Sequence, residues 1–589
     1  MPISRKKKRM LIIIGVILSV LVILLLTLNT ILSNQADSYL RDELSKVDTS
    51  TYTIDFEKIR VNLFTGSVNI YNIDIKPSAT AMNDLRENDT APVVAEIRVR
   101  RVKLARLAIL KALKGKVFNI GSLSVMDPEM TVYGPGGMFS GLKNSKESQN
   151  DTSSDTIPDL PVKEIFLNFF ELENANFKWI DMSSNKVVVE THDLTITVDD
   201  LWMHHPEGDT SSHVLDLDDA ELSLESHFMD LPGDLYSIST GELNVSYQDR
   251  SLILDSLHLI PKYSKEKFAH VVGKQTDRFD LSLGRLELSG IVFDSLVTKK
   301  IIIDEVNLTN PIADIYRDKR VARDMSIFPK LFQTSIASLA MPVDVKQVTV
   351  DGAMINYQEQ LEGAPRSGQV IFEQFDITVS GINNDPALIQ SGQAMIVDGQ
   401  ALFMGKAPLS IHIDLPIGSK TEKFSYYGAL QKMDAVVMNP MIEHMAFFEA
   451  KEGVIHSAKF YGLAENDTII GRIEFLYNDL KVNVIKKQKE KKQGIRDNLF
   501  LSALAGTVLI KNNPQANKPV RICKMFFVRD PNKGFFNYIW KPVQSGLIHT
   551  LISGKKQQLH DMSWAEFESK WYTTLESDRK AHRHQHKKK

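Results

Sequence analysis

The stretch KIIIDEVNLTNPIADIY, Lys300 to Tyr316, contains a pattern that recurs along the chain. Its apolar residues mostly stand two apart, which is typical of a strand with one buried face. Each step of three, from Ile303 to Val306 and from Leu308 to Pro311, changes this alternation once, as a β-bulge or a bend would. We call the pattern a cassette. Its positions here are Ile301, Ile303, Val306, Leu308, Pro311, Ala313 and Ile315.

Six further stretches fit the same template in whole or in part. The long copies are Phe118, Ile120, Leu123, Val125, Pro128, Met130, Val132; Ile165, Leu167, Phe170, Leu172, Ala175, Phe177, Trp179; and Val343, Val345, Val348, Val350, Ala353, Ile355, Tyr357. The short copies are Val68, Ile70, Ile73, Ile75; Leu252, Leu254, Leu257, Leu259; and Val370, Phe372, Phe375, Ile377. We expect Pro128 or Pro311 to mark the point where a strand leaves its pairing.

An internal duplication accompanies the cassettes. Ile97, Val99, Val102, Leu104 and Leu107 precede the cassette at Phe118, and a matching series precedes the cassette at Ile301: Leu281, Leu283, Leu286, Leu288 and Ile291. Each copy predicts a strand, a short helix and a second strand. Growth by repetition implies that every copy buries its apolar face against its neighbours.

Strand patterns dominate the chain and long helical patterns are scarce. A hairpin is expected over Thr51–Pro77 with its turn at Gly66, and the charged piece Lys486–Arg496 is expected to form a hairpin tip. Short helices are expected over Ser335–Met341 and Asn439–Ala450. A terminal amphipathic helix is predicted by residues at helical spacing: Val543, Leu547, Ile548 and Leu551.

Met10 to Leu28 carries no charged residue and as a helix would measure about 28 Å, close to the hydrocarbon core of a bilayer. Basic residues precede it and acidic residues follow, so the positive-inside rule predicts a cytoplasmic N-terminus. A cleaved signal peptide is the alternative, but the apolar stretch is long for one and no A-x-A site follows. The anchor residues are Leu11, Ile14, Val16, Leu18, Val22, Leu25 and Leu28.

Composition and motifs argue against several function classes. The 589 residues carry 70 basic and 73 acidic side chains, a net charge of -3 that does not suit a general nucleic-acid binder. The single cysteine, Cys523, excludes an internal disulfide and is expected to be a buried thiol. Phosphate-binding, HExxH and GxSxG motifs are missing, so no catalytic residue, metal ligand or cofactor is predicted.

These patterns divide the chain into successive parts. They are a basic N-terminus (1–9), an anchor (10–32), a first strand region (36–133), a flexible Gly- and Ser-rich loop (134–156), the main strand region (157–534), C-terminal amphipathic helices (535–575) and a basic tail (576–589). Between Arg98 and Lys116 the chain is strongly basic and amphipathic. That piece is either a solvated surface or a contact for anionic lipid head groups, and the solvated surface is favoured.

The anchor, the L-x-L-x-x-P cassettes at Leu123–Pro128 and Val306–Pro311, and the C-terminal strings GRIEFLYNDLKVNV and RDPNKGFFNYIWKPVQSGLIHTL together resemble the AsmA-like family of Gram-negative envelope proteins, in a form associated with Bacteroidetes. The resemblance covers about Leu11 to Leu551. It implies a single inner-membrane helix, a periplasmic location for the rest of the chain, and a relation to bridge-like lipid-transfer proteins. The family offers no catalytic residues.

The expected fold is therefore mainly β: an N-terminal transmembrane helix, then an elongated, twisted, groove-shaped antiparallel sheet of repeated cassettes with a few short helices. An apolar sheet face without helices to cover it must close on itself, pack on a second sheet or meet a ligand. Carrying a sixteen-carbon chain through water costs roughly 13 kcal/mol, which an apolar trough would largely remove. We expect the trough to be lined by Ile70, Ile75, Ile120, Val125, Leu167, Leu172, Leu283, Leu288, Ile303, Leu308, Val345 and Val350.

Two functions follow as hypotheses. The first is binding of lipid acyl chains in support of phospholipid transport between the inner and outer membranes, with phospholipid or another envelope lipid as ligand and an outer-membrane or periplasmic protein as a possible partner. The second is a structural or assembly factor that affects outer-membrane protein biogenesis through protein contacts. Nucleic acid is not expected as a partner.

Overall fold

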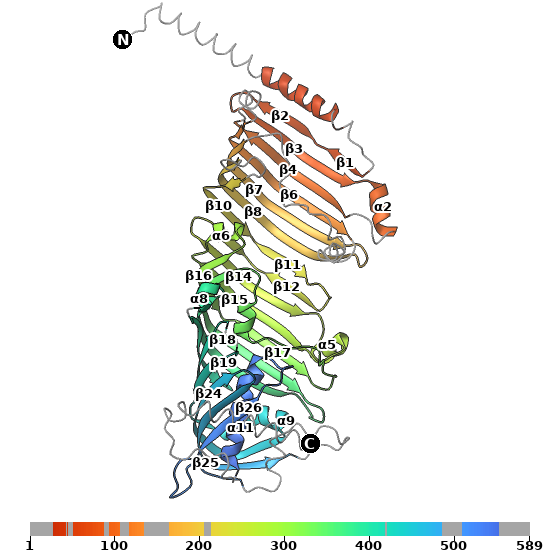
Figure 1. Ribbon diagram of the computed structural model, residues 1–589. Helices are drawn as coiled ribbons and strands as arrows, with labels where there is room; N and C mark the ends of the chain where they lie inside the picture. The colour runs from red at the N-terminus through yellow and green to blue at the C-terminus, as the bar shows by residue number, and fades with distance from the viewer. Residues whose placement is uncertain are drawn as a thin grey trace, which may run out of the picture. The chain divides into compact units, whose positions relative to one another are not determined.

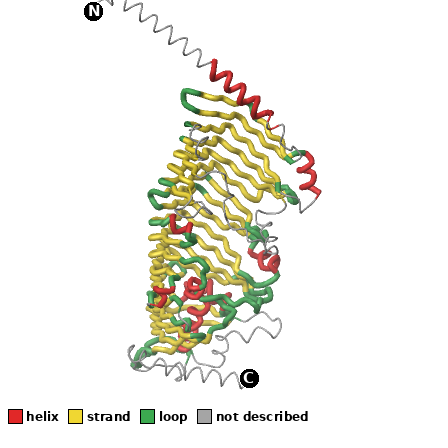
Figure 2. Tube along the Cα trace, turned by 45° about the horizontal axis from the view of Figure 1, so that its top comes forward, coloured by secondary structure: helices red, strands yellow, loops and turns green. Residues whose placement is uncertain are grey.

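The computed structural model describes residues 27–42, 44, 51–87, 93–106, 117–134, 164–204, 214–390, 392–418, 421–485 and 509–552. Two compact units divide between Leu254 and Asp255, inside strand β14 (Ser251–Pro261). We call residues 1–254 unit 1 and residues 255–589 unit 2. Strands predominate in both (Figure 2), as the cassettes predict.

Unit 1 consists mainly of strands that follow one another side by side (Figure 1). Its elements before β14 are β1 (Tyr52–Asp55), β2 (Lys58–Asn62), β3 (Ser67–Pro77), α2 (Ala79–Glu87), β4 (Val94–Ala105), β5 (Val117–Ile120), β6 (Ser122–Gly134), β7 (Glu164–Asp181), β8 (Lys186–His204), β9 (Val214–Asp216), β10 (Asp219–Leu224), β11 (Ser226–Asp230), β12 (Tyr236–Thr240) and β13 (Leu243–Ser246). The predicted hairpin is confirmed by β2 and β3, with Gly66 in the left-handed conformation at the turn.

Unit 2 combines strands with several short helices and one longer helix. Its elements after β14 are α5 (Lys265–Val272), β15 (Asp277–Ser289), α6 (Phe293–Val297), β16 (Ile301–Thr309), β17 (Ile312–Asp318), α7 (Phe332–Ala337), β18 (Val343–Gln360), β19 (Gly368–Asn383), α8 (Pro386–Gln390), β20 (Ala394–Phe403), β21 (Ala407–Pro416), β22 (Phe424–Leu430), β23 (Met433–Asp434), η1 (Ala435–Met438), α9 (Asn439–Met445), β24 (Phe448–Glu465), β25 (Thr468–Val484), β26 (Ile522–Val528) and α11 (Phe535–Leu551).

The strands are not all antiparallel, which corrects the expected fold. In unit 1, β5 and β6 pair with β7 in parallel, and in unit 2, β16 and β17 pair with β18 in parallel. The remaining described pairings are antiparallel. The physical reason is the connection: a long crossover returns the chain to the same end of the sheet before the next strand begins, whereas a short hairpin reverses it. Residues 319–342 form that crossover in unit 2.

The two prolines of the cassettes behave differently. Pro311 stands between β16 and β17, as expected for a residue that leaves the pairing. Pro128 lies inside β6 and keeps its pairing with Val99 of β4, but it has no partner in β7, because the β6–β7 ladder is interrupted between Met126 and Glu129. Its missing N–H is tolerated because the ladder is already irregular beside Asp127, whose φ is +47°.

A large hydrophobic core lies in unit 2, where α11 packs against β25 and β26 (Figure 1). The predicted terminal helix is confirmed, and α11 begins at Phe535. Val543, Ile548 and Leu551 are buried in it and Leu547 packs against the core. In the described part of unit 1, a small cluster around Leu85 and Val94 joins α2 to the sheet.

The other predicted helices are shorter than expected or displaced. Helix α7 ends at Ala337 rather than extending to Met341, and α9 ends at Met445 because the chain enters β24 at Phe448. The helical piece after Leu104, the 134–156 loop beyond Gly134, the Lys486–Arg496 tip and everything after residue 552 lie outside the described residues.

Most of the predicted anchor also lies outside the described residues, including Leu11, Ile14, Val16, Leu18, Val22 and Leu25. Leu28 belongs to a helix over residues 27–42 and is exposed. This helix contacts β2, where the Val61 amide donates to Ser33 Oγ at 2.8 Å and the Leu63 amide donates to Asn29 Oδ1 at 3.0 Å. Among the described helices, none is long and apolar enough to cross a bilayer.

Candidate functional site

The long cassettes lie side by side as two parallel pairs, in the register that their sequence alignment gives. Leu123 pairs with Phe170 and Val125 with Leu172 in unit 1. In unit 2 six of the seven cassette positions are matched: Ile301 with Val343, Ile303 with Val345, Val306 with Val348, Leu308 with Val350, Ala313 with Ile355 and Ile315 with Tyr357. Each unit therefore contains one copy of the predicted duplication, and each copy ends in a parallel pair of strands.

A residue in the left-handed conformation marks one step of three in each of the seven cassettes, which is the second of the two steps in the long cassettes. It stands directly before the apolar residue that ends a step of three. These residues are Asn72, Asp127, Asn174, Ser256, Asn310, Gly352 and Gln374, with φ between +47° and +66°. The extra residue of a bulge restores the face, so apolar side chains before and after the step lie on one side of the sheet.

Bulges on neighbouring strands contact one another. Asn174 Nδ2 donates to Asp127 Oδ1 at 3.2 Å across the parallel pair of unit 1. In unit 2 the Gly352 amide donates to Asp376 Oδ1 at 2.8 Å, and a Cβ on Gly352 would stand 2.7 Å from Asn310 Oδ1. Aligned bulges bend several strands at one level, so the sheet changes direction along a line. The sequence feature that indicates these bulges is an Asn, Asp or Gly at most of the positions, because these residues adopt the left-handed conformation most readily.

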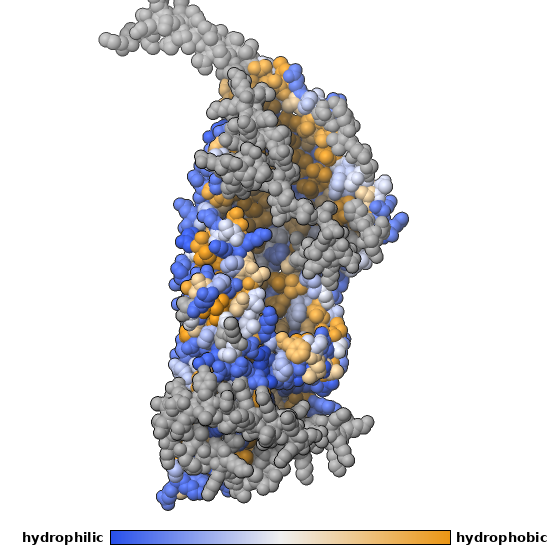
Figure 3. Space-filling view, viewed as in Figure 1, coloured by the Kyte–Doolittle hydropathy of each residue, from blue (hydrophilic) through white to orange (hydrophobic). Residues whose placement is uncertain are grey.

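In unit 1, direct pairing aligns apolar side chains across nine strands. We call this series row 1; because paired residues share a face, its members point to the same side of the sheet. Row 1 consists of Ile59, Ile70, Val102, Val125, Leu172, Ile196, Leu222, Val245 and Leu252. Ile59 is buried and all the others are half-buried. The small cluster that α2 forms with the sheet includes none of them. Figure 3 shows hydrophobic side chains in a hollow where the described strands of this unit are open to view.

The equivalent series in unit 2, row 2, extends over ten strands. Row 2 consists of Leu286, Leu308, Val350, Ile377, Gly399, Ile411, Gly428, Phe460, Ile473 and Cys523. Its first members are half-buried, but Ile473 and Cys523 are only 0% and 1% exposed. The cover is α11: a Cβ on Gly546 would lie 2.5 Å from Ile473 Cγ2. Burial raises the pKa of the Cys523 thiol, which confirms the predicted buried thiol.

The structure places most of the predicted trough residues on the half-buried face. Leu167 and Val345 stand five residues before Leu172 and Val350 with no register shift between them, so they point to the opposite face. Ile70, Val125 and Leu172 stand in row 1, and Leu308 and Val350 in row 2. Three others pair directly with an apolar neighbour: Ile75 with Ile97, Ile120 with Leu167, and Leu288 with Val306. Leu167, Leu283 and Val345 are buried; the other nine, including Ile303, are half-buried.

Along the strands of unit 2 the apolar face ends in charge. Two residues beyond Ile315, Arg317 pairs with Asp277 on one side and Glu359 on the other. We call these three the charged row. Arg317 Nε donates to Asp277 Oδ1 at 2.6 Å, and Lys319 Nζ lies 2.6 Å from Glu359 Oε1. Burial, and then the charge of Glu359, raise the pKa of Tyr357, whose hydroxyl donates to Glu359 Oε2 at 3.0 Å.

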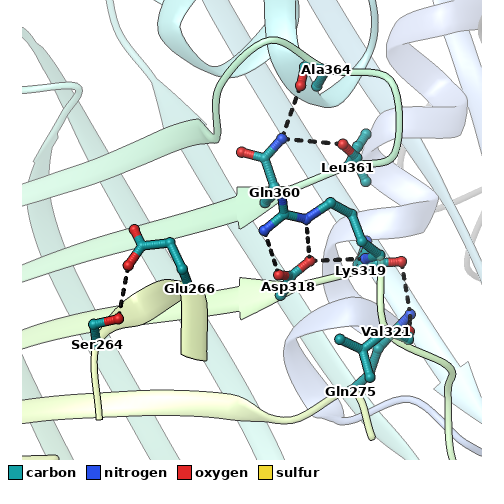
Figure 4. A network of polar contacts seen from close by, with 10 residues as sticks. Ser264, Glu266, Gln275, Asp318, Lys319, Val321, Gln360, Leu361 and Ala364 are labelled. Atoms are coloured by element: carbon teal, nitrogen blue, oxygen red, sulfur yellow. Dashed lines mark hydrogen bonds and ion pairs between the residues drawn. The ribbon is translucent and has the colours of Figure 1, made fainter. Parts of the chain in front are cut away.

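A polar network holds the chain just beyond the charged row (Figure 4). Gln275 Nε2 donates to the carbonyls of Lys319 and Val321 at 3.2 and 2.8 Å, and Arg320 forms an ion pair with buried Asp318 at 2.6 Å. Gln360 Nε2 donates to the carbonyls that follow it in the β18–β19 turn. These contacts fix the backbone that carries Lys319.

Lys533 adds a further cation to this end of unit 2. Its amide donates to the Asp530 carbonyl at 2.9 Å, and Asp530 forms an ion pair with Arg323 at 3.1 Å. Burial, together with the positive charges of Lys319, Arg323 and Arg317, lowers the pKa of Lys533 to about 8. Within the described part of the chain, the Lys533 ammonium forms no ion pair of its own. The sequence patterns did not predict this cluster.

Two of the basic residues of β4 form ion pairs at the surface. Arg98 Nη2 lies 2.6 Å from Glu96 Oε1, and Arg100 pairs with Asp127. The described residues contain no group of three His, Cys, Asp or Glu placed to hold a metal ion. No protein-family model matches the chain, and no curated protein shows significant similarity to its sequence.

Proposed function

We propose that the protein binds lipid acyl chains on the apolar sheet face of unit 1 and supports lipid movement between the two membranes of a Gram-negative envelope. The observation that carries the proposal is row 1: eight half-buried apolar side chains in direct register, none of which belongs to the cluster that α2 forms with the sheet. An exposed apolar surface of this kind is costly in water. An acyl chain would cover it without any fixed polar contact.

The strand pattern also explains how a chain could slide. Rows of aliphatic side chains on successive strands lie about 4.8 Å apart, so a long acyl chain crosses several strands and meets a similar surface at each. Dispersion contacts are individually weak, and one position resembles the next. Movement along such a face needs no nucleophile, metal or nucleotide. The envelope location and the membrane anchor in this proposal come from the family resemblance.

Two substitutions in one strand test the proposal. Ile196→Asp places a charge in row 1, whereas Thr197→Asp places the same charge on the opposite face of β8, because successive side chains alternate. The full chain is purified from a Gram-negative host, and bound lipid is extracted and quantified by mass spectrometry. We expect Ile196→Asp to reduce bound lipid at least fivefold and Thr197→Asp to leave it unchanged.

The proposal fails if the wild-type chain carries no lipid and binds no tail-labelled fluorescent phospholipid. It also fails if the two variants retain lipid equally. Circular dichroism and limited proteolysis of both variants establish that any loss of lipid does not come from unfolding.

A further inference from the structure

The face of β15, β17 and β18 changes from apolar to charged in three successive rows of directly paired residues. The first row is Leu281, Ala313 and Ile355; the second is Phe279, Ile315 and Tyr357; the third is the charged row, Asp277, Arg317 and Glu359. Rows two residues apart are separated by about 6.7 Å along the strands. This order of two apolar rows followed by a charged row would match an amphiphile that has an apolar tail and a charged head.

The charges at this end suit an anion. Arg317, Lys319 and Arg323 each have a carboxylate partner, in Asp277, Glu359 and Asp530 respectively. Lys533 faces those three cations and is the fourth positive charge against three negative ones. A cation held among like charges and partly removed from water is stabilised when an anion approaches, and a phosphate oxygen accepts a charge-assisted hydrogen bond from an ammonium.

The same position in unit 1 has no such cations. In the aligned cassettes, Gly134 replaces Arg317 and Asp181 replaces Glu359, and the two pair directly. Asp181 is buried and accepts hydrogen bonds from Ser183 Oγ at 2.8 Å and from the Ser183 amide at 3.1 Å. The two copies of the duplication therefore share an apolar face, but only unit 2 ends it with Arg317, Lys319 and Lys533.

We propose that Lys533, close to Arg317 of the charged row, binds the phosphate of an anionic lipid whose acyl chain lies along Ile315 and Ala313. This inference rests on the proposed function, since it assumes that the apolar face takes acyl chains. It adds the class of lipid and the side chain that selects it. Unit 1 then holds tails without regard to the head group, and unit 2 selects a negatively charged head.

The test uses the full-length chain in detergent and a tail-labelled fluorescent phosphatidylglycerol, followed by fluorescence polarisation. The competitors are unlabelled dioleoylphosphatidylglycerol, dioleoylglycerol with the same tails but no phosphate, and soluble glycerol phosphate. Lys533→Met removes the charge and Lys533→Arg keeps it. Lys406→Met is the matched control, because Lys406 is an exposed lysine in the β20–β21 turn of the same unit.

We expect phosphatidylglycerol to compete about tenfold better than dioleoylglycerol in the wild type, in Lys533→Arg and in Lys406→Met, and equally well in Lys533→Met. A preference that survives Lys533→Met overturns the inference and leaves the proposed function standing. Competition by glycerol phosphate at the same concentration overturns the lipid assignment in favour of free phosphate. If neither lipid binds the wild type, both the inference and the proposed function are wrong.

Discussion

Row 1 and row 2 are built from the same cassette pattern, yet they end in different environments. Row 1 remains half-buried from Ile70 to Leu252, across eight strands of unit 1. Row 2 begins in the same way at Leu286 but reaches complete burial at Ile473, where α11 packs on β25 and β26. The difference is the covering helix rather than the strands.

This comparison indicates two roles for apolar rows of the same sequence pattern. Where α11 lies on the sheet, apolar side chains stabilise the fold, because they are removed from water and packed on both sides. Where the row stays half-buried, side chains of the same type contribute less to stability and leave a surface for a ligand. The following predictions test that distinction, beginning with the largest expected effect.

The same substitution in the two rows is expected to have unequal costs. Ile473→Ala empties a site with 0% exposure, so it should lower the free energy of unfolding of its unit by about 3 kcal/mol. Ile196→Ala removes a half-buried side chain and should cost about 1 kcal/mol. Hydrogen exchange of peptides from β25 and β8 measures each effect locally. Equal costs would contradict the distinction between the rows.

A substitution at Gly546 tests whether α11 packs closely on β25 and β26. A Cβ there would stand 2.5 Å from Ile473 Cγ2 and 2.8 Å from Met525 Cγ, so Gly546→Val should destabilise unit 2 by about 2 kcal/mol. Gly534 has open space where its Cβ would be and an ordinary φ of -76°, which makes Gly534→Ala the control, with less than about 0.5 kcal/mol expected. Thermal unfolding measures the stability of both variants. If Gly546→Val leaves the stability unchanged, α11 does not pack closely on the sheet.

Replacement of Gly352, the left-handed glycine at the bulge of β18, should destabilise unit 2. Gly352 has a φ of +66°, and its Cβ would lie 2.7 Å from Asn310 Oδ1, so Gly352→Ala should cost about 1.5 kcal/mol. Gly233 in unit 1 has a φ of +92° and open space around its Cβ, so Gly233→Ala should cost about 1 kcal/mol from backbone strain alone. Chemical denaturation compares them, and a larger cost at Gly233 would refute the close approach of neighbouring bulges.

The smallest expected effect is the pH dependence of Lys533. Its folded-state pKa of about 8 lies below its ordinary value of 10.5, so the unfolded chain binds more protons between these values. Stability should therefore rise with pH from about 8 to about 10.5, by about 1 kcal/mol once solvent screening is allowed for. The Lys533→Met variant should lack this rise. An identical pH profile in the variant would show that Lys533 is fully solvated.

Much of the fold follows from the sequence through spacing alone. Steps of two and three indicate the strands, and alignment of the cassettes matches Val125 with Leu172 and Leu308 with Val350, as the strand pairing does. The strand direction did not follow, because alternation is the same in parallel and antiparallel strands and only the connection distinguishes them. The terminal helix was predictable from the helical spacing of Val543, Leu547, Ile548 and Leu551, and α11 begins at Phe535, where the C-terminal helical part was expected.

The candidate site divides in the same way. The half-buried face was predictable, since it is a direct product of apolar periodicity. The cation cluster was not, because Lys533 lies more than two hundred residues from Arg317 in the chain and meets it only through the fold. The charged residues nine positions after Leu308 and Val350, Arg317 and Glu359, are visible in the sequence, but they give no indication of a partner near α11.

Photo-crosslinking tests the central claim most directly. A phospholipid with a diazirine in its acyl chain is incubated with the full-length chain, irradiated, and the modified peptides are mapped by mass spectrometry. We predict labelling of row 1 residues such as Val125, Leu172 and Ile196, with none at Thr197 on the opposite face or at Ile473 beneath α11. Labelling spread equally over both faces of β8, or confined to other parts of the chain, would contradict the account.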